Sequence, residues 1–329
     1  MKKIFMLAGG MLVAVVAFVH LSTARAAEIP NCALNVKSGW NLKSIGEFVC
    51  GFMEIDSSNT KISNFPAYID VYGYDGREYV HGRIRKQDIE NRNNGSFGNS
   101  VESYFNSRIK NITGGQYSTV ESYFSDAENS ITGNNLQKIK EYAGKLARES
   151  FSSVWIYNPG SDFSVVHYPR TNDDDDEIMA ILGLNLLSGN ISDSGYAQLK
   201  ASLEEWSVSA SRELERYPGM ISFIRELFSG RVPLESGWNF LSYSKVLLDD
   251  GGRINLNSGN CNITKAYLFN NSTKNWVRLG DVSASMVGSG LVAYNAGSAC
   301  TLNVKNQYLD FVTNLLGGGS QATPPPLPN

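Results

Sequence analysis

The chain has 329 residues, of which 42% are hydrophobic, and its 29 basic and 32 acidic residues give a formal net charge of −3. This length predicts two or three domains, each large enough to bury a core. The mildly acidic balance disfavours nucleic acid as a partner, because binding to phosphates depends on clustered lysine and arginine.

The first 26 residues have the pattern of a secretory signal peptide. Two lysines precede an almost wholly apolar run at 4–19, and Ala-Arg-Ala at 24–26 has the spacing of a cleavage site. Cleavage would remove three of the 29 basic residues and no acidic residue, which changes the net charge to −6. An uncleaved membrane anchor is the alternative, and no later stretch is apolar enough to span a bilayer. We therefore expect a secreted, periplasmic or extracellular bacterial protein without a transmembrane segment after cleavage.

Four cysteines, an even number, predict disulfide bonds in such a compartment. Three pairings are possible, and we favour the local one, Cys32 with Cys50 and Cys261 with Cys300. Each closed loop would stabilise the fold by about 3–4 kcal/mol, mainly by restricting the unfolded chain. No Cys-x-x-Cys occurs, so the sequence gives no support to redox catalysis.

The tetrapeptide Ser-Gly-Trp-Asn occurs at 38–41 and again at 236–239. The two-residue period of a strand places Trp40 and Leu42 on one face, and the second copy repeats this pattern. We expect the tryptophan of each copy to anchor a core, and the preceding glycine to allow either a close backbone approach or an unusual φ. Ligand stacking by the tryptophan is the alternative.

Two 19-residue segments, 100–118 and 119–137, both contain Val-Glu-Ser-Tyr-Phe followed by Ile-Thr-Gly. Apolar residues recur at helical spacing in both segments and again over 136–150. This predicts three short antiparallel helices at about 98–150, inserted into a β module. Four residues are suited to cap the starts and ends of these helices: Ser100, Thr119, Gly114 and Gly133.

Residues 154–168 predict a hairpin that we match to a second hairpin at 265–279. Between the two lies a helical region at 171–231, which begins with an acidic run. Acidic residues favour a helix start through the helix dipole, and Asp173 and Asp175 are weak calcium candidates as the alternative. The spacing of the run does not fit an EF-hand.

These elements predict an α+β chain with two small β sandwich- or barrel-like modules, the first interrupted by helices and a helical linker region between them. The predicted segments are a signal peptide at 1–26, a β module at 27–170, helices at 171–231, a second β module at 232–312 and a flexible Gly/Pro-rich tail at 313–329.

The second module resembles the GWNL-type β modules of exported bacterial and archaeal surface proteins. The residues that carry the resemblance are Gly237-Trp238-Asn239, Tyr267, Trp276 and Gly-Ser-Gly-Leu-Val at 288–292. The chain departs from the family at Leu291, where the family has an aromatic residue, and the first copy lacks a clear Gly-x-Gly strand. The resemblance covers about a third of the chain. It implies β modules that serve as surface or interaction domains, and it brings no catalytic residues.

No motif for catalysis, cofactor binding or metal binding is present. Outside the signal peptide only His81 and His167 occur, with no Gly-x-Ser-x-Gly elbow, zinc-ligand spacing or phosphate-binding loop. We expect no cofactor, and we expect His167 to be a strand residue. Paired carboxylates for polysaccharide hydrolysis would be distant in sequence and stay an alternative.

We therefore expect a non-enzymatic binding or structural protein of a bacterial envelope, with a protein or glycan partner. The alternatives are a polysaccharide or cell-wall hydrolase and a pilus or secretion-machinery component. Two loops rich in aromatic and amide residues, 72–79 and 270–276, are the expected contact regions. The candidate ligand-binding residues in them are Tyr72, Tyr74, Tyr79, Asn271 and Trp276.

Overall fold

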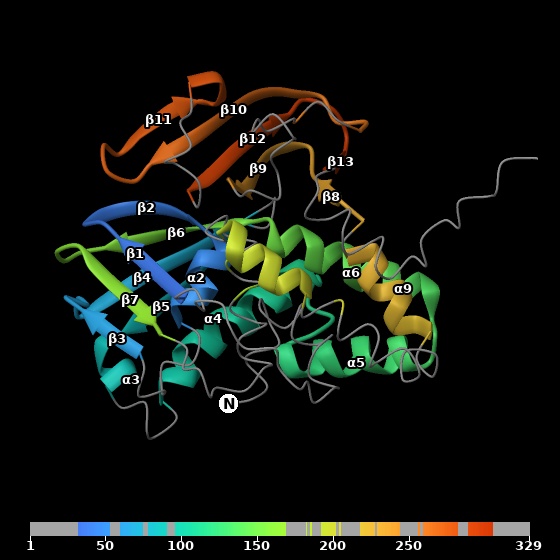
Figure 1. Ribbon diagram of the computed structural model, residues 1–329, viewed down its shortest axis with the longest axis horizontal. Helices are drawn as coiled ribbons and strands as arrows, with labels where there is room; N and C mark the ends of the chain where they lie inside the picture. Colours follow the sequence, from blue (N-terminus) through green and yellow to red (C-terminus); the bar gives the residue numbers. More distant parts are fainter. Residues whose placement is uncertain are drawn as a thin grey trace, which may run out of the picture.

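The computed structural model (Figure 1) confirms the α+β class, because it contains helices together with several antiparallel sheets. The described residues are 32–52, 60–74, 78–90, 96–168, 182, 185, 192–201, 204, 218–227, 229–243, 256, 259–281 and 289–304. The predicted signal peptide, the acidic run with Asp173 and Asp175, and the C-terminal tail lie outside them. The sandwich- or barrel-like form of each module and the domain boundaries stay predictions.

The first module contains two antiparallel sheets, joined by the short helix α2 (Ile45–Phe52). Its strands are β1 (Cys32–Val36), β2 (Gly39–Ser44), β3 (Thr60–Ser63), β4 (Tyr68–Tyr74), β5 (Tyr79–Arg85), β6 (Ser153–Asn158) and β7 (Phe163–His167). One sheet has the order β2-β6-β4-β5 and the other the order β1-β7-β3.

The second module repeats this arrangement with fewer residues. Its elements are β8 (Arg231–Leu234), β9 (Gly237–Ser242), β10 (Ile263–Asn270), β11 (Asn275–Arg278), the 3-10 helix η4 (Leu279–Asp281), β12 (Gly290–Asn295) and β13 (Cys300–Asn303). The four-stranded sheet has the order β9-β12-β10-β11, and β8 pairs with β13. The two four-stranded sheets therefore have the same topology, in which β2, β6, β4 and β5 correspond to β9, β12, β10 and β11.

The strand register gives the same correspondence. Gly39 lies opposite Asn158 in the first module, and Gly237 lies opposite Asn295 in the second. The glycine of each pair has a positive φ, 77° and 91°, which is the second of the two predicted alternatives. This conformation is readily available to glycine because it has no Cβ atom.

Residues 154–168 do not form the predicted hairpin. β6 pairs with β2 and β4, whereas β7 pairs with β1 and β3, so the two strands lie in different sheets. Their counterparts are β12 and β13, and the shared Tyr-Asn-x-Gly-Ser at 157–161 and 294–298 marks this correspondence. The predicted hairpin at 265–279 is confirmed, because β10 and β11 pair with Phe269 opposite Trp276.

The helical insertion lies between β5 and β6. It consists of α3 (Lys86–Glu90), α4 (Ser96–Ile112), α5 (Val120–Thr132) and α6 (Leu136–Ser150), and a further helix, α9 (Pro218–Leu227), packs on α5 and α6. Thr119 caps α5 by accepting a hydrogen bond from the Ser122 backbone N–H, and Gly133 is the C-cap, as predicted. The prediction that Ser100 caps the first helix is wrong, because α4 begins four residues earlier.

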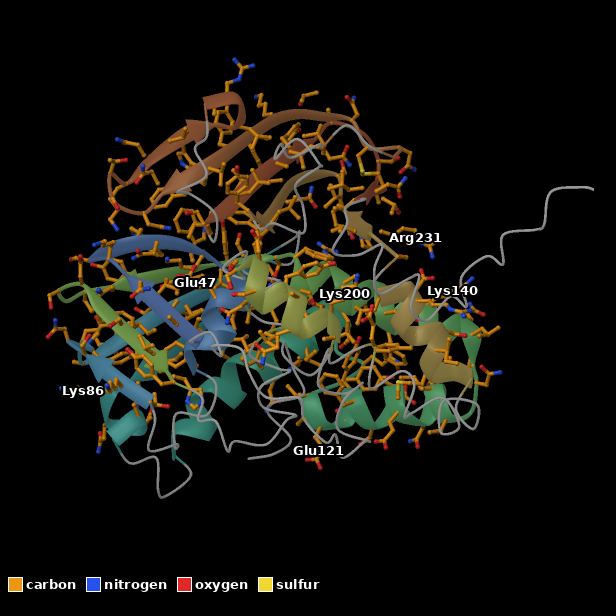
Figure 2. All side chains as sticks on the ribbon, in the orientation of Figure 1. Glu47, Lys86, Glu121, Lys140, Lys200 and Arg231 are labelled. Atoms are coloured by element: carbon orange, nitrogen blue, oxygen red, sulfur yellow. A yellow bond between two sulfur atoms is a disulfide. The ribbon has the colours of Figure 1, made fainter. Side chains whose placement is uncertain are left out.

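Buried residues at helical spacing hold α4 against β5 of the first sheet and hold α5 and α6 against each other and against α9. The side chains of Tyr104, Tyr123, Ile139 and Tyr142 are almost fully buried. Charged side chains such as Glu121 and Lys140 lie on the outer surface of the helical layer in Figure 2, whereas the buried Glu47 is bonded to Lys43. Among the described residues, no helix has both the length and the apolar character needed to cross a membrane.

The asparagine of each Ser-Gly-Trp-Asn is the buried residue of the motif, and the prediction that the tryptophan anchors a core is wrong. Trp40 and Trp238 are 45% and 39% exposed, whereas Asn41 is fully buried. The Asn41 side chain accepts a hydrogen bond from the Lys37 backbone N–H and donates to the Lys37 and Gly39 carbonyls. These bonds satisfy an otherwise costly buried amide and fix the turn that enters β2.

Asn239 makes the corresponding three bonds to Glu235 and Gly237 at distances of 2.9–3.1 Å. A second asparagine, Asn158 or Asn295, completes each turn from the facing strand and donates to the same residue, through the carbonyl of Lys37 or Glu235. The repeated tetrapeptide is therefore a turn-forming motif in which the backbone satisfies the amide.

The two modules contact each other through equivalent strands, as Figure 1 shows for β9 and β12 beside β2 and β6. Lys43 forms a β-bridge with Ser289, and Leu241 forms one with Ser152. In the register, Leu241 is the counterpart of Lys43 and Ser152 is the counterpart of Ser289. The contact is therefore reciprocal, like an isologous interface between two copies of one subunit.

Candidate binding cleft

An aromatic cleft of about 740 Å³ lies where the two modules meet. The first module provides most of its wall through β2, β4, β5 and β6, and the second provides the hairpin of β10 and β11. The cleft is lined by Ser38, Gly39, Trp40, Tyr72, Tyr79, Trp155, Phe269 and Lys274.

Strand register brings the aromatic residues of the first module to one face of its sheet. Leu42 lies opposite Trp155, and Trp155 lies opposite Tyr72 on its other side. Because side chains at alternate positions share a face, Trp40 projects from the same side. The opposite face of this sheet packs against the helices, so this aromatic face is the one available to the second module and to a ligand.

The rings stand at large angles to one another. The centroid of Trp40 lies 5.5 Å from that of Tyr72 and 5.9 Å from that of Trp155, with interplanar angles of 47° and 82°. Phe269 meets Trp155 edge to face at 4.9 Å. Such tilted and edge-to-face contacts are the preferred geometries of aromatic pairs. The rings pack together in this way while 45% of the surface of Trp40 stays exposed.

The second module is fixed to this wall by the turn between β10 and β11. The Leu42 backbone N–H donates to Asn271 Oδ1 at 2.7 Å, and Asn271 Nδ2 donates to the Leu42 carbonyl at 3.2 Å. β2 is the edge strand of its sheet, so Asn271 satisfies edge groups that would otherwise be open. Lys274, three residues on, donates from Nζ to the Trp40 carbonyl at 2.8 Å.

Two charged residues, Lys274 and Asp162, lie at the cleft and affect each other's pKa. Burial lowers the pKa of Lys274, and the nearby Asp162 acts in the opposite direction. The pKa of Asp162 is itself lowered by the Lys37 ammonium and by the Ser38 backbone N–H, each 2.8 Å from a carboxylate oxygen. Asp162 is therefore already held by two donors.

A cluster of polar side chains lies next to the cleft on β4 and β5. Asp70 accepts two hydrogen bonds from Arg83, at 2.7 and 3.0 Å, and lies 3.1 Å from His81 Nε2. The bonds from Arg83 lower the pKa of Asp70. The His81 ring stacks on Tyr72 at 4.6 Å, which links this group to the aromatic wall.

The five residues predicted to bind a ligand lie close together at the junction of the modules. Tyr72 and Tyr79 line the cleft. Tyr74 contacts Tyr79, and Trp276 contacts Trp155 and Phe269. Asn271 bonds to the backbone of Leu42 and so joins the modules. Tyr72, Tyr74 and Tyr79 lie in β4 and β5, which corrects the prediction that they lie in a loop.

Among the aromatic residues of the lining, sequence reasoning missed Trp155 and Phe269. Lys274 lies in the predicted contact region 270–276 but was not among the named candidates. Trp40 was noticed but assigned to a core. The hairpin match paired Trp155 with Tyr267 and Phe269 with Tyr157, so it gave no sign that Trp155 and Phe269 are in contact. The available signal was the Tyr-Asn-x-Gly-Ser repeat, which aligns β6 with β12. With that alignment, the hairpin of β10 and β11 corresponds to β4 and β5.

The sequence also made predictions about the cysteines, His167 and metal binding. Cys261 and Cys300 form a disulfide with an S–S distance of 2.06 Å, whereas the side chains of Cys32 and Cys50 lie outside the described ones. His167 is a fully buried strand residue that contacts Thr60 at 3.3 Å. Nowhere in the described parts of the chain do three or more His, Cys, Asp or Glu side chains gather in a way that could hold a metal ion.

Comparisons with family models, with curated proteins and with solved structures find no match to this chain.

Proposed function

We propose that the chain is a secreted or periplasmic, non-enzymatic binding protein of a bacterial envelope, and that the aromatic cleft binds a glycan. The observation that carries the proposal is the exposed Trp40 in a wall with Tyr72 and Trp155, positioned by strand register and closed by the second module. The apolar C–H faces of sugar rings pack on such rings, and hydroxyl-bearing side chains at the rim suit sugar hydroxyls.

The charge states beside the cleft support binding in preference to hydrolysis. Glycoside cleavage requires a carboxylic acid that donates a proton and a second carboxylate about 5–10 Å away. No carboxylate is among the described residues that line the cleft. Asp70 and Asp162, which lie nearby, are held ionised by their partners, and this is the opposite of the raised pKa of a general acid.

The resemblance to GWNL-type modules is consistent with this proposal and stays a prediction, as do secretion and the envelope location. In this proposal the two sheets serve as the scaffold. Their junction, rather than a loop of either module, is the binding surface.

Substitution of one of two matched tryptophans tests the proposal. Trp40 contacts Tyr157 at 5.0 Å between ring centroids, and Trp238 contacts Tyr294 at 5.1 Å in the equivalent position of the second module. Both are partly exposed, and Trp40 alone of the two lines the cleft. Binding to a glycan array and titration calorimetry on a bound glycan would measure the effect.

We expect Trp40→Ala to weaken glycan binding about tenfold, because about 1.5 kcal/mol of aromatic contact is lost. Trp238→Ala should leave the affinity within about twofold. Circular dichroism and the unfolding midpoint of each variant check that the fold is retained. Equal loss in both variants, or no binding to any glycan on the array, would overturn the proposal.

A further inference from the structure

Among the described residues that line the aromatic cleft, Lys274 is the one with a charged side chain, and this charge is positive. The Lys274 ammonium donates to the backbone carbonyl of Trp40 at 2.8 Å, so it is held at the residue whose indole lines the cleft. The other polar groups of the lining are the hydroxyls of Ser38, Tyr72 and Tyr79, which can donate to a ligand. The cleft thus combines apolar ring faces with hydrogen-bond donors and one cation.

Asp162, the carboxylate that acts on Lys274, already has a partner, and so does Glu47 beside Lys43. Asp162 binds Lys37, and Glu47 binds Lys43 at 2.8 Å. Among the described residues, the Lys274 ammonium bonds to a neutral carbonyl. Burial lowers the pKa of Lys274. A partly buried cation in this state gains most from an anionic partner, because a charge-assisted bond is about twice as strong as a neutral one.

The position of Lys274 is fixed before any ligand binds. It closes the turn at 271–274 with a left-handed φ of 59°. Asn270 Oδ1 accepts the backbone N–H groups of Ser272 and Thr273 at 2.9 and 3.0 Å, and Asn271 holds the turn to β2. A group held in this way loses little conformational freedom on binding, which favours affinity and specificity.

We propose that the cleft selects a sugar chain with an anionic substituent, a carboxylate or a phosphate, which pairs with Lys274 while an adjacent ring packs on Trp40. This inference rests on the proposed function and names the class of glycan. The same cation disfavours a quaternary ammonium ligand, although aromatic walls of this kind can hold one. Lysine acts as a point charge, so it accepts either anion without the planar geometry that arginine requires.

The test compares ligands that differ only in charge. Titration calorimetry at low salt would measure a galacturonate hexasaccharide, the same hexasaccharide with every carboxylate methyl-esterified, and a phosphorylated mannose hexasaccharide beside its neutral parent. The full chain would be used in wild-type form and as Lys274→Met. The matched control is Lys265→Met, a lysine of the same strand-turn region whose ammonium lies 5.8 Å from the Tyr294 ring, outside the cleft.

We expect at least one anionic hexasaccharide to bind about tenfold tighter than its neutral counterpart, and Lys274→Met to abolish that difference. Lys265→Met should preserve it. The ligand pair that shows the preference for the anionic sugar distinguishes a carboxylate from a phosphate. This preference should weaken as the salt concentration rises.

Three results would overturn the inference. If neutral and anionic hexasaccharides bind with equal affinity and Trp40→Ala still weakens both, the charge selection is wrong and the glycan-binding proposal stands. If none of the sugars binds in a manner sensitive to Trp40→Ala, both fail. If a peptide of residues 321–329 binds with an affinity that Trp40→Ala reduces, while the sugars do not bind, the cleft takes a proline-rich segment.

Discussion

The two modules share their strand order and their asparagine turns, yet they differ in the side chains at equivalent positions of the sheet face that bears Trp40 or Trp238. Asp70 lies opposite Tyr157 in the first module, and Lys265 lies opposite Tyr294 in the second. Trp155 and Val292 are likewise counterparts, since each is two residues before the tyrosine of Tyr-Asn-x-Gly-Ser.

This comparison separates two kinds of residue. Buried amides that bond to the backbone recur because the turn geometry depends on them, whereas other side chains on the same strands differ without altering the topology. The aromatic wall occurs in the first module, where Trp155 replaces an aliphatic residue. Substitutions at the shared and at the differing positions test this distinction.

Gly290→Ala should have the largest effect, because it acts on the contact between the modules. A Cβ atom at this position would lie 2.1 Å from Leu42 Cγ, and Leu42 is fully buried. We expect a loss of about 3 kcal/mol in the free energy of unfolding, measured by urea denaturation. The double variant Leu42→Ala/Gly290→Ala should lose less than the sum of the single variants, because the smaller side chain makes room. Additive effects would contradict a direct clash.

Asn41→Ala and Asn239→Ala should destabilise the protein by similar amounts, about 2 kcal/mol each, because each leaves backbone groups of a buried turn without a partner. Asn→Asp at the same positions is the matched control, since the carboxylate can still accept from the backbone N–H but cannot donate to the two carbonyls. A difference of more than about 1 kcal/mol between the modules would show that the two turns are not equivalent in energy.

Asn271→Ala should cost about 1 kcal/mol, because it removes two hydrogen bonds to the edge of β2 at a partly buried site. Hydrogen exchange of the Leu42 amide should become faster, while that of amides within β10 changes little. Ser272→Ala, one residue away and exposed, is the control. Unchanged protection of Leu42 in the Asn271 variant would disprove the role of this residue in joining the modules.

The smallest expected effect concerns pH. Arg83 lowers the pKa of Asp70, so folding favours the ionised carboxylate. Its contribution is fully present above the unfolded pKa, about 3.9, and is lost as the pH falls through the lower folded pKa. Asp70→Asn should remove less than about 1 kcal/mol at neutral pH, because Arg83 is solvated, and should flatten stability against pH below about 4. If the stability of Asp70→Asn falls with decreasing pH as steeply as that of the wild type, this assignment is contradicted.

The helices and the second hairpin could be predicted because their signals are local. The spacing of Ile139, Tyr142, Ala143 and Leu146 marks one helix face, and turn residues mark 271–274. Thr119 was identified as a cap from its side chain alone. These elements need no information about distant residues.

The cleft could be predicted only in part, because its wall depends on register between strands far apart in the sequence. Strand alternation shows that Trp40 and Leu42 share a face, but it does not show which face is covered. The covered side chain next to them is Asn41, whose amide bonds to the backbone, and no hydrophobic pattern identifies such a residue. Tyr72 and Tyr79 were selected for their residue type, and their contact with Trp40 and Trp155 required the paired sheet.

The helical insertion between β5 and β6 has a consequence for the order of folding. β2 must pair with β6 across a separation that includes α2 and the four helices of the insertion, with Gly39 opposite Asn158. β9 reaches β12, with Gly237 opposite Asn295, across a shorter separation. Longer loops cost more entropy to close, and folding rates fall as contacts become less local. We therefore expect the C-terminal sheet to form first after dilution from denaturant, and the N-terminal sheet to be completed afterwards, once its helices have condensed.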